Sequence, residues 1–174
     1  FIHEHATEPF FLYVPHSMPH VPLGVGPRFR QSTEYGTYGD VIREIDWSVG
    51  QLREALEEEG VLDETIFIYA SDNGPWLSYG DHAGTTGGLR EGKGTTFEGG
   101  VRVPFIVRYP DVVPAGTTSS EPCMTIDVLP TLATLTGSRE SMGSLEIDGK
   151  DISPILKGVP GARSPHEALY FWYR

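Results

Sequence analysis

The sequence predicts an α/β fold, in which strands and helices alternate along the chain. Two observations support this prediction: short apolar runs that end in turn residues, and a long amphipathic helical pattern that lies between two of them. The clearest run is 66–70, which is rich in β-branched and aromatic residues and suits a strand covered on both faces. We therefore expect a mainly parallel or mixed sheet with flanking helices.

The first half of the chain carries a strand pattern and a helix pattern. The apolar run 10–14 is bounded by prolines and predicts a strand. An irregular loop over 24–36 follows. Apolar residues at spacings of three and four from Tyr38 to Leu56 then predict an amphipathic helix that Gly60 terminates.

The second half repeats this alternation. After the strand at 66–70, the alternating residues of 102–109 predict a strand that Pro110 stops. An apolar stripe then predicts a helix over 124–137, with Pro130 near its first turn and Gly137 at its end.

Composition restricts the classes of function. The chain has 174 residues and a formal net charge of −11, and its 13 basic residues are scattered, which argues against a nucleic-acid binder. No run approaches the roughly 18 apolar residues that a membrane span needs, so no span is expected. Cys123 is the only cysteine, which excludes disulfides within the chain and metal sites built on cysteine pairs.

The segment Ser71-Asp72-Asn73-Gly74 follows the 66–70 strand directly. Ligands of open α/β sheets bind outside the carboxyl ends of strands, and neighbouring oxygen-bearing side chains suit a hard cation such as Ca²⁺ or Mg²⁺. The other interpretation is an ordinary Asx turn closed by Gly74 and Pro75. The local sequence alone favours the ordinary turn.

Two histidines lie in the proline-rich segment that follows the first strand pattern. Prolines at 15, 19 and 22 prevent a helix, so His16 and His20 cannot form a helical zinc pair. In an extended segment both imidazoles lie on one face and could line one cleft. Histidine suits acid and base chemistry, although a histidine in such a loop is more often structural.

Glycines crowd the stretch 78–100. The spacing from Gly87 to Lys93 matches a phosphate-binding P-loop, but Gly94 replaces the required Ser or Thr and no clear helix follows, so we reject nucleotide binding. Lys93 remains a cation held between glycines and suits an anionic oxygen. His82, Arg90 and Glu98 share this stretch, and each alone is more often structural than catalytic.

Together, His20 in Pro-His-Ser-Met-Pro-His-Val-Pro, the Ser71 to Gly74 turn and Lys93 in Gly-Lys-Gly-Thr-Thr-Phe-Glu-Gly-Gly-Val-Arg-Val-Pro resemble type I, formylglycine-dependent sulfatases of the arylsulfatase branch. The resemblance covers nearly the whole chain, and the Lys93 segment is its most specific part. It implies an alkaline-phosphatase-like α/β core and hydrolysis of sulfate esters of aryl or carbohydrate alcohols.

The resemblance also implies roles for particular residues. Asp72 and Asn73 would be two ligands of a bound Ca²⁺, or of Mg²⁺. Lys93 would bind a sulfate oxygen, and His20 would contact the ester oxygen and help to protonate the leaving group. Weaker substrate-binding candidates are His16, His82 and Arg90.

One motif of that family does not occur in the sequence. The family's nucleophile is a formylglycine made from a Cys/Ser-x-Pro-x-Arg motif, whereas Cys123 is followed by Met-Thr-Ile. We therefore expect the middle-to-C-terminal part of a larger sulfatase, inactive alone, with its nucleophile on sequence preceding Phe1. Residues 1–160 would belong to the catalytic α/β domain and 161–174 to the start of a truncated C-terminal subdomain.

The resemblance extends to partners and compartment. It implies a sulfated small molecule or glycan as substrate and a formylglycine-generating enzyme acting on the N-terminal part. It also implies an exported protein, whether periplasmic, secreted or lysosomal, and leaves the oligomeric state open. Two other functions remain: a phosphodiesterase or phosphonate hydrolase of the same superfamily, and a non-catalytic module that binds a cation or anion.

Overall fold

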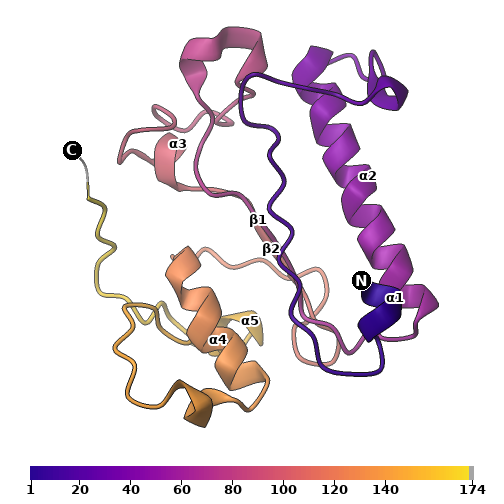
Figure 1. Ribbon diagram of the computed structural model, residues 1–174. Helices are drawn as coiled ribbons and strands as arrows, with labels where there is room; N and C mark the ends of the chain where they lie inside the picture. The colour runs from indigo at the N-terminus through magenta and orange to yellow at the C-terminus, as the bar shows by residue number, and fades with distance from the viewer. Residues whose placement is uncertain (173–174) are drawn as a thin grey trace. The chain divides into compact units, whose positions relative to one another are not determined.

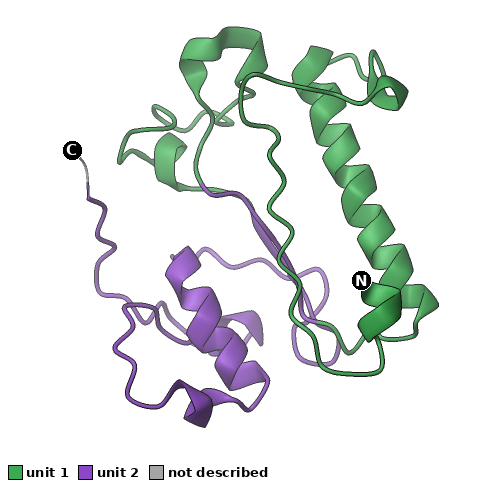
Figure 2. Cartoon of the chain, viewed as in Figure 1, with its two compact units in different colours: residues 1–65, 73–104 green, residues 66–72, 105–174 purple. Residues whose placement is uncertain are grey.

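The computed structural model describes residues 1–172, and the chain divides into two compact units (Figure 2). Unit 1 comprises 1–65 and 73–104, and unit 2 comprises 66–72 and the chain from 105 onward. The last two residues of the expected C-terminal segment, 173–174, lie outside the described residues. No helix within the described range is long and apolar enough to cross a membrane.

Unit 1 is organised by α2 (Gly36–Glu58), the long purple helix of Figure 1. Its apolar residues Val41, Ile45 and Leu56 are buried, as the spacing of three and four predicts. The helix ends where Gly60 takes a φ of +72° and Val61 N donates to Leu56 O at 3.0 Å. The expected helix and its glycine stop are confirmed.

The remaining helices of unit 1 are short. They are α1 (Ile2–His5), the 3₁₀ turns η1 (Pro27–Phe29) and η2 (Leu77–His82), and α3 (Glu98–Val101). The single turn of α3 corrects the expectation that no helix follows Lys93. Gly99 and Gly100 lie buried within that turn and do not interrupt it.

A buried carboxylate joins α2 to the loop that precedes it. Asp40 is only 4% exposed, and its oxygens accept hydrogen bonds from the backbone N–H groups of Gln31, Ser32 and Thr33 at 2.7, 3.0 and 2.9 Å. Burial alone would raise the pKa of this carboxyl, but these donors and the Thr33 hydroxyl lower the pKa below its usual value.

The strand expected over 10–14 is wrong. This segment has no regular secondary structure, and Phe11 and Tyr13 are 76% and 75% exposed. A strand needs a hydrogen-bonded neighbour, and the only two strands among the described residues pair with each other. The residues of 10–14 are of the kind that favours a strand, but the segment does not pair with a neighbouring strand.

Unit 2 contains those two strands, β1 (Phe67–Ala70) and β2 (Phe105–Arg108), and both expected strands are confirmed in position. They pair antiparallel, with Phe67 opposite Arg108 and Ala70 opposite Phe105. An antiparallel pair is compatible with a mixed sheet. The strand expected to be covered on both faces is half-buried here, with Ala70 exposed.

One face of this pair packs on α4 (Val128–Leu135), the orange helix of Figure 1. A small apolar hollow is lined by Ile68 and Val107 from the strands and by Val128 and Leu132 from the helix. The expected helix is confirmed as η3 (Thr125–Asp127) followed by α4, with Pro130 in the first turn and Gly137 past the end at a φ of +69°. Two short helices complete the unit, η4 (Arg139–Met142) and α5 (Ser153–Leu156).

Candidate functional site

The candidate site of unit 1 rests on a compact arrangement of glycines. Gly74 N donates to Gly100 O at 2.9 Å, and Gly99 N donates to Arg90 O at 2.8 Å, so the loop before α3 folds back on the turn after Asn73. A Cβ on Gly74 would collide with the Gly99 carbonyl, and one on Gly92 would collide with the Pro75 carbonyl. Only glycine permits these backbone approaches.

Lys93 is fixed by this arrangement at its backbone. Its N–H donates to Pro75 O at 2.9 Å, and its half-buried side chain places Nζ 5.4 Å from the centre of the Trp76 ring. An ammonium at this distance from an indole face makes a cation–π contact. The structure thus holds a positive charge beside an aromatic surface.

The same indole also contacts His20. The ring centres of His20 and Trp76 are 6.1 Å apart at an interplanar angle of 64°. His20 Nδ1 lies 2.7 Å from Val21 O, and because a carbonyl can only accept, Nδ1 carries the hydrogen of this bond. Nε2 takes no part in this hydrogen bond. The structure brings together two predicted site residues, His20 and Lys93, at one side chain.

Asp72 and Asn73 follow β1 by two and three residues, as expected. Asp72 is exposed and Asn73 half-buried, and both take part in polar interactions. Their oxygens suit a hard cation in kind, but two residues fall short of the six to eight oxygens that Ca²⁺ takes. Among the described residues no three His, Cys, Asp or Glu side chains form a group that could hold a metal ion.

The weaker substrate-binding candidates have other placements. His16 Nε2 lies 3.0 Å from Ser48 Oγ on α2, so its ring is hydrogen-bonded to that helix. His82 is exposed at the end of η2. The Arg90 guanidinium lies over the Phe97 ring at 3.8 Å, which uses its planar group for packing. The structure does not bring these three residues to Trp76.

Sequence reasoning missed Trp76 and Tyr79, whose ring centres lie 4.9 Å apart in an edge-to-face contact. The available signal was an aromatic residue directly after the Asp-Asn-Gly-Pro turn. The contact between Trp76 and Lys93 becomes visible only in the structure, where the loop that carries Lys93 folds back beside Trp76.

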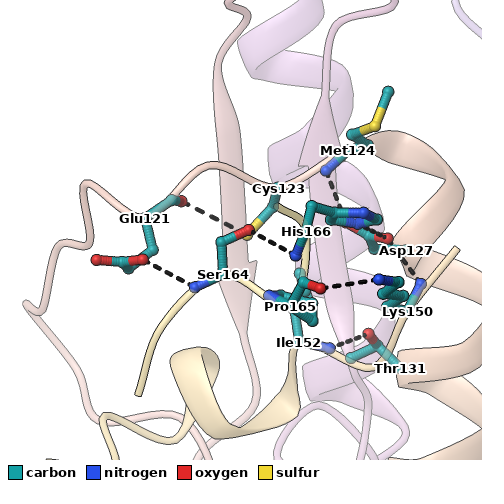
Figure 3. A network of polar contacts seen from close by, with 10 residues as sticks. All are labelled: Glu121, Cys123, Met124, Asp127, Thr131, Lys150, Ile152, Ser164, Pro165 and His166. Atoms are coloured by element: carbon teal, nitrogen blue, oxygen red, sulfur yellow. Dashed lines mark hydrogen bonds and ion pairs between the residues drawn. The ribbon is translucent and has the colours of Figure 1, made fainter. Parts of the chain in front are cut away.

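Sequence reasoning also missed a buried polar network in unit 2 (Figure 3). The Asp127 side chain is 0% exposed, and it accepts hydrogen bonds from Met124 N, Lys150 N and His166 Nε2 at 2.7, 2.8 and 2.7 Å. Two segments distant in the sequence, at Lys150 and His166, therefore meet the η3 turn at one carboxylate. An aspartate just before a helix predicts a cap, but nothing local predicts the contacts with Lys150 and His166.

Cys123 lies at the edge of this network, where its thiol is 3.6 Å from Glu121 O. Burial raises the pKa of the Cys123 thiol, and the carboxylates of Asp127 and Glu121 raise it further. A thiol with a raised pKa holds little thiolate at neutral pH. The structure thus agrees with the sequence argument against Cys123 as a nucleophile.

Comparisons with known proteins point to one family. The family model described as Sulfatase matches residues 1–138. Arylsulfatase A of Bos taurus is 40% identical over 169 residues, which cover 97% of this chain and 32% of that protein. The chain therefore spans about a third of the length of this relative.

Solved structures agree. The PsFucS1 sulfatase from Pseudoalteromonas sp. gives a TM-score of 0.78 at 30% identity, over 88% of this chain and 30% of that one. BT4656, in complex with its substrate D-glucosamine-2-N,6-O-disulfate, gives 0.56 at 28% over 76% and 25% of the two chains. The phosphonate monoester hydrolase SpPMH from Silicibacter pomeroyi gives 0.55 at 26% over 76% and 23%.

Proposed function

Because the chain belongs to the sulfatase family, we propose that it is part of an enzyme that hydrolyses sulfate esters of aryl or carbohydrate alcohols. The observation that carries the proposal is the position of Lys93 Nζ and the His20 ring against one indole, that of Trp76. A fixed cation and a titratable imidazole beside one surface are what transfer of a charged sulfuryl group requires.

Lys93 binds an oxygen of the sulfate in this proposal. Its backbone is fixed through the Pro75 carbonyl, so the ammonium is positioned before the substrate arrives. A preorganised cation stabilises the negative charge on the transferring sulfuryl oxygens without reorganising during the reaction.

His20 acts as the general acid. Its Nδ1–H is engaged by Val21 O, so the proton that it gives to the departing alcohol oxygen comes from Nε2 of the imidazolium. This hydrogen bond also fixes the orientation of the ring. Protonation of the leaving oxygen relieves the charge that builds up as the bond to sulfur breaks.

We propose that Asp72 and Asn73 provide two of the ligands of a Ca²⁺ ion, for which Mg²⁺ is the alternative hard cation. A divalent cation supplies additional charge stabilisation for the sulfuryl oxygens. The formylglycine motif of the family does not occur in 1–174. Residues 1–174 alone are accordingly proposed to be inactive, with a formylglycine-generating enzyme acting on the sequence that carries the motif.

The test compares two lysine variants of the full-length protein. Lys93→Met removes the ammonium at nearly constant length and should lower kcat for an aryl sulfate by about 10²- to 10³-fold, as loss of a preorganised charge donor does. Lys157→Met removes an exposed lysine outside the site and should leave kcat unchanged. Equal activity of the two variants would remove Lys93 from the proposed mechanism.

A phosphonate or phosphate monoester hydrolase is a second candidate, because the solved structure of a phosphonate monoester hydrolase matches 76% of this chain. Sulfuryl and phosphoryl groups share tetrahedral geometry, so the same cation and acid serve both. Parallel assays with phenyl sulfate and a phenyl phosphonate monoester discriminate the two functions. Higher kcat/KM for the phosphonate would replace the sulfatase proposal.

We also propose an exported protein, in keeping with the family resemblance, that acts on a sulfated small molecule or glycan. The complex of BT4656 with a doubly sulfated glucosamine supports a sulfated substrate. Fractionation of the native host, with the sulfatase activity followed through the fractions, tests the compartment.

A further inference from the structure

Trp76 and Tyr79 both expose a large part of their aromatic surface to solvent. Trp76 is 42% exposed and Tyr79 is 49% exposed, although the two rings meet edge to face at 4.9 Å and 68°. Each ring therefore packs against the other and still exposes part of its surface to solvent. Aromatic surface beside charged side chains can hold the apolar face of a ligand.

These rings lie beside the proposed reaction centre. Trp76 contacts both the His20 ring and Lys93 Nζ, so the indole adjoins both the proposed acid and the proposed sulfate-binding cation. A sulfate ester bound with its sulfur end at Lys93 and its ester oxygen at His20 therefore has its alcohol portion close to the indole.

The backbone that carries the indole is also fixed on both sides of Trp76. Pro75 O accepts the Lys93 N–H at 2.9 Å, and Tyr79 N donates to Trp76 O at 3.1 Å. The backbone beneath the aromatic surface does not have to be ordered on binding, which lowers the entropic cost of the contact.

We propose that Trp76 and Tyr79 form a subsite for the ring of the alcohol portion of the substrate. This inference rests on the proposed function, because it takes His20 and Lys93 as the reaction centre. The subsite selects a sulfate ester whose alcohol carries a ring with an apolar face. An aryl ring and the C–H face of a pyranose share that chemistry, whereas an open-chain alkyl alcohol does not.

A kinetic experiment on the full-length protein tests the subsite through a ratio. The kcat/KM for phenyl sulfate and for glucose 6-sulfate are each divided by that for ethyl sulfate. Trp76→Ala should lower one or both ratios by about 2- to 12-fold, the range of a lost aromatic contact, through KM. Trp76→Phe should restore most of the ratio. The affected ratio identifies whether the subsite takes an aryl ring or a sugar.

Trp47→Ala is the matched control, because Trp47 is 39% exposed and contacts Phe29 and Arg28 away from Lys93. Its ratios should equal those of the wild type. Should Trp76→Ala lower all three kcat/KM values equally, Trp76 would act only on Lys93 and His20, and the subsite would be refuted.

A binding measurement separates failure of the subsite from failure of the proposed function. Calorimetry with benzenesulfonate and methanesulfonate needs no turnover, and wild type should bind the ring-bearing sulfonate more tightly. Trp76→Ala should remove that difference. A wild type that shows the difference but hydrolyses no sulfate ester keeps the subsite and overturns the sulfatase proposal, whereas equal affinities for both sulfonates overturn the subsite.

Discussion

Asp127 in unit 2 is fully buried and accepts hydrogen bonds from three segments, whereas Lys93 and His20 in unit 1 are only partly covered and meet at an aromatic ring. Both regions contain titratable side chains fixed by their surroundings. In unit 2 the charged atoms themselves are fixed by the fold. In unit 1 the backbone is fixed while the charged ends lie next to an exposed surface.

The difference separates a polar cluster that the fold uses from a pair of side chains that the proposed mechanism uses. The Asp127 oxygens are used by the fold, so the cluster stabilises and has little left to offer a ligand. Around Lys93 the glycines make the close contacts of the fold instead, and the ammonium lies against Trp76, where it is proposed to bind the sulfate. Variants in each region should therefore change different observables.

The largest effect on stability is expected from Asp127→Ala. The substitution leaves the N–H groups of Met124, Lys150 and His166 without their acceptor, which should cost about 3–5 kcal/mol in the free energy of unfolding. Urea denaturation measures this loss. Asp148→Ala, at an exposed aspartate, should change the same quantity by less than about 0.5 kcal/mol. Similar losses in the free energy of unfolding for the two variants would show that the buried Asp127 network does not stabilise unit 2 more than an exposed aspartate does.

A smaller stability effect, joined to a loss of activity, is expected from Gly92→Ala. The added Cβ meets the Pro75 carbonyl and the Leu77 side chain, so the backbone of Lys93 must move, at a cost of about 1–3 kcal/mol. Activity should fall as well, because the ammonium shifts with its backbone. The measurements, on the full-length protein, are urea denaturation and turnover of an aryl sulfate.

Gly50→Ala is the matched control for this prediction. Gly50 lies inside α2, and nothing lies within 4 Å of its added Cβ. Alanine should therefore stabilise the helix by about 0.5–1 kcal/mol and leave activity unchanged. Destabilisation by both substitutions would show that the close approach at Gly92 is not the cause.

The smallest effect concerns acid stability through Asp40. Its folded-state pKa is lowered, so its contribution to stability is present above the usual aspartate pKa of about 3.9 and is lost as pH falls through the lower folded value. Wild type should have a higher urea midpoint than Asp40→Asn at pH 7. The two midpoints should converge as pH falls below about 4. A pH-independent gap would show that the carboxylate's charge is not what the Gln31 to Thr33 donors stabilise.

The fold was predictable where the pattern was local. The spacing from Tyr38 to Leu56 and the stop at Gly60 gave α2, and the apolar runs gave β1 and β2. The same reasoning failed for 10–14, because an apolar run does not say whether a neighbouring strand is present. A helix makes its backbone hydrogen bonds within one segment, whereas a strand needs a second segment to pair with.

The candidate site was predictable in its residues and not in its geometry. The motif around Lys93 and the histidine at 20 were visible in the sequence, and the structure places both against Trp76. The contact of Trp76 with Lys93 depends on how the glycine loop folds. The contact of Asp127 with His166 joins residues 39 apart, and no local pattern encodes such a pair.

The sequence separation of the Asp127 contacts also determines the order in which the residues of this network are synthesised. A growing chain makes Asp127 first, Lys150 after 23 further residues and His166 after 39. Until the last of these leaves the ribosome, the carboxylate at the start of α4 cannot complete its bonds and keeps its water. The hydrogen bonds of Asp127 can therefore be completed only after His166 has been translated.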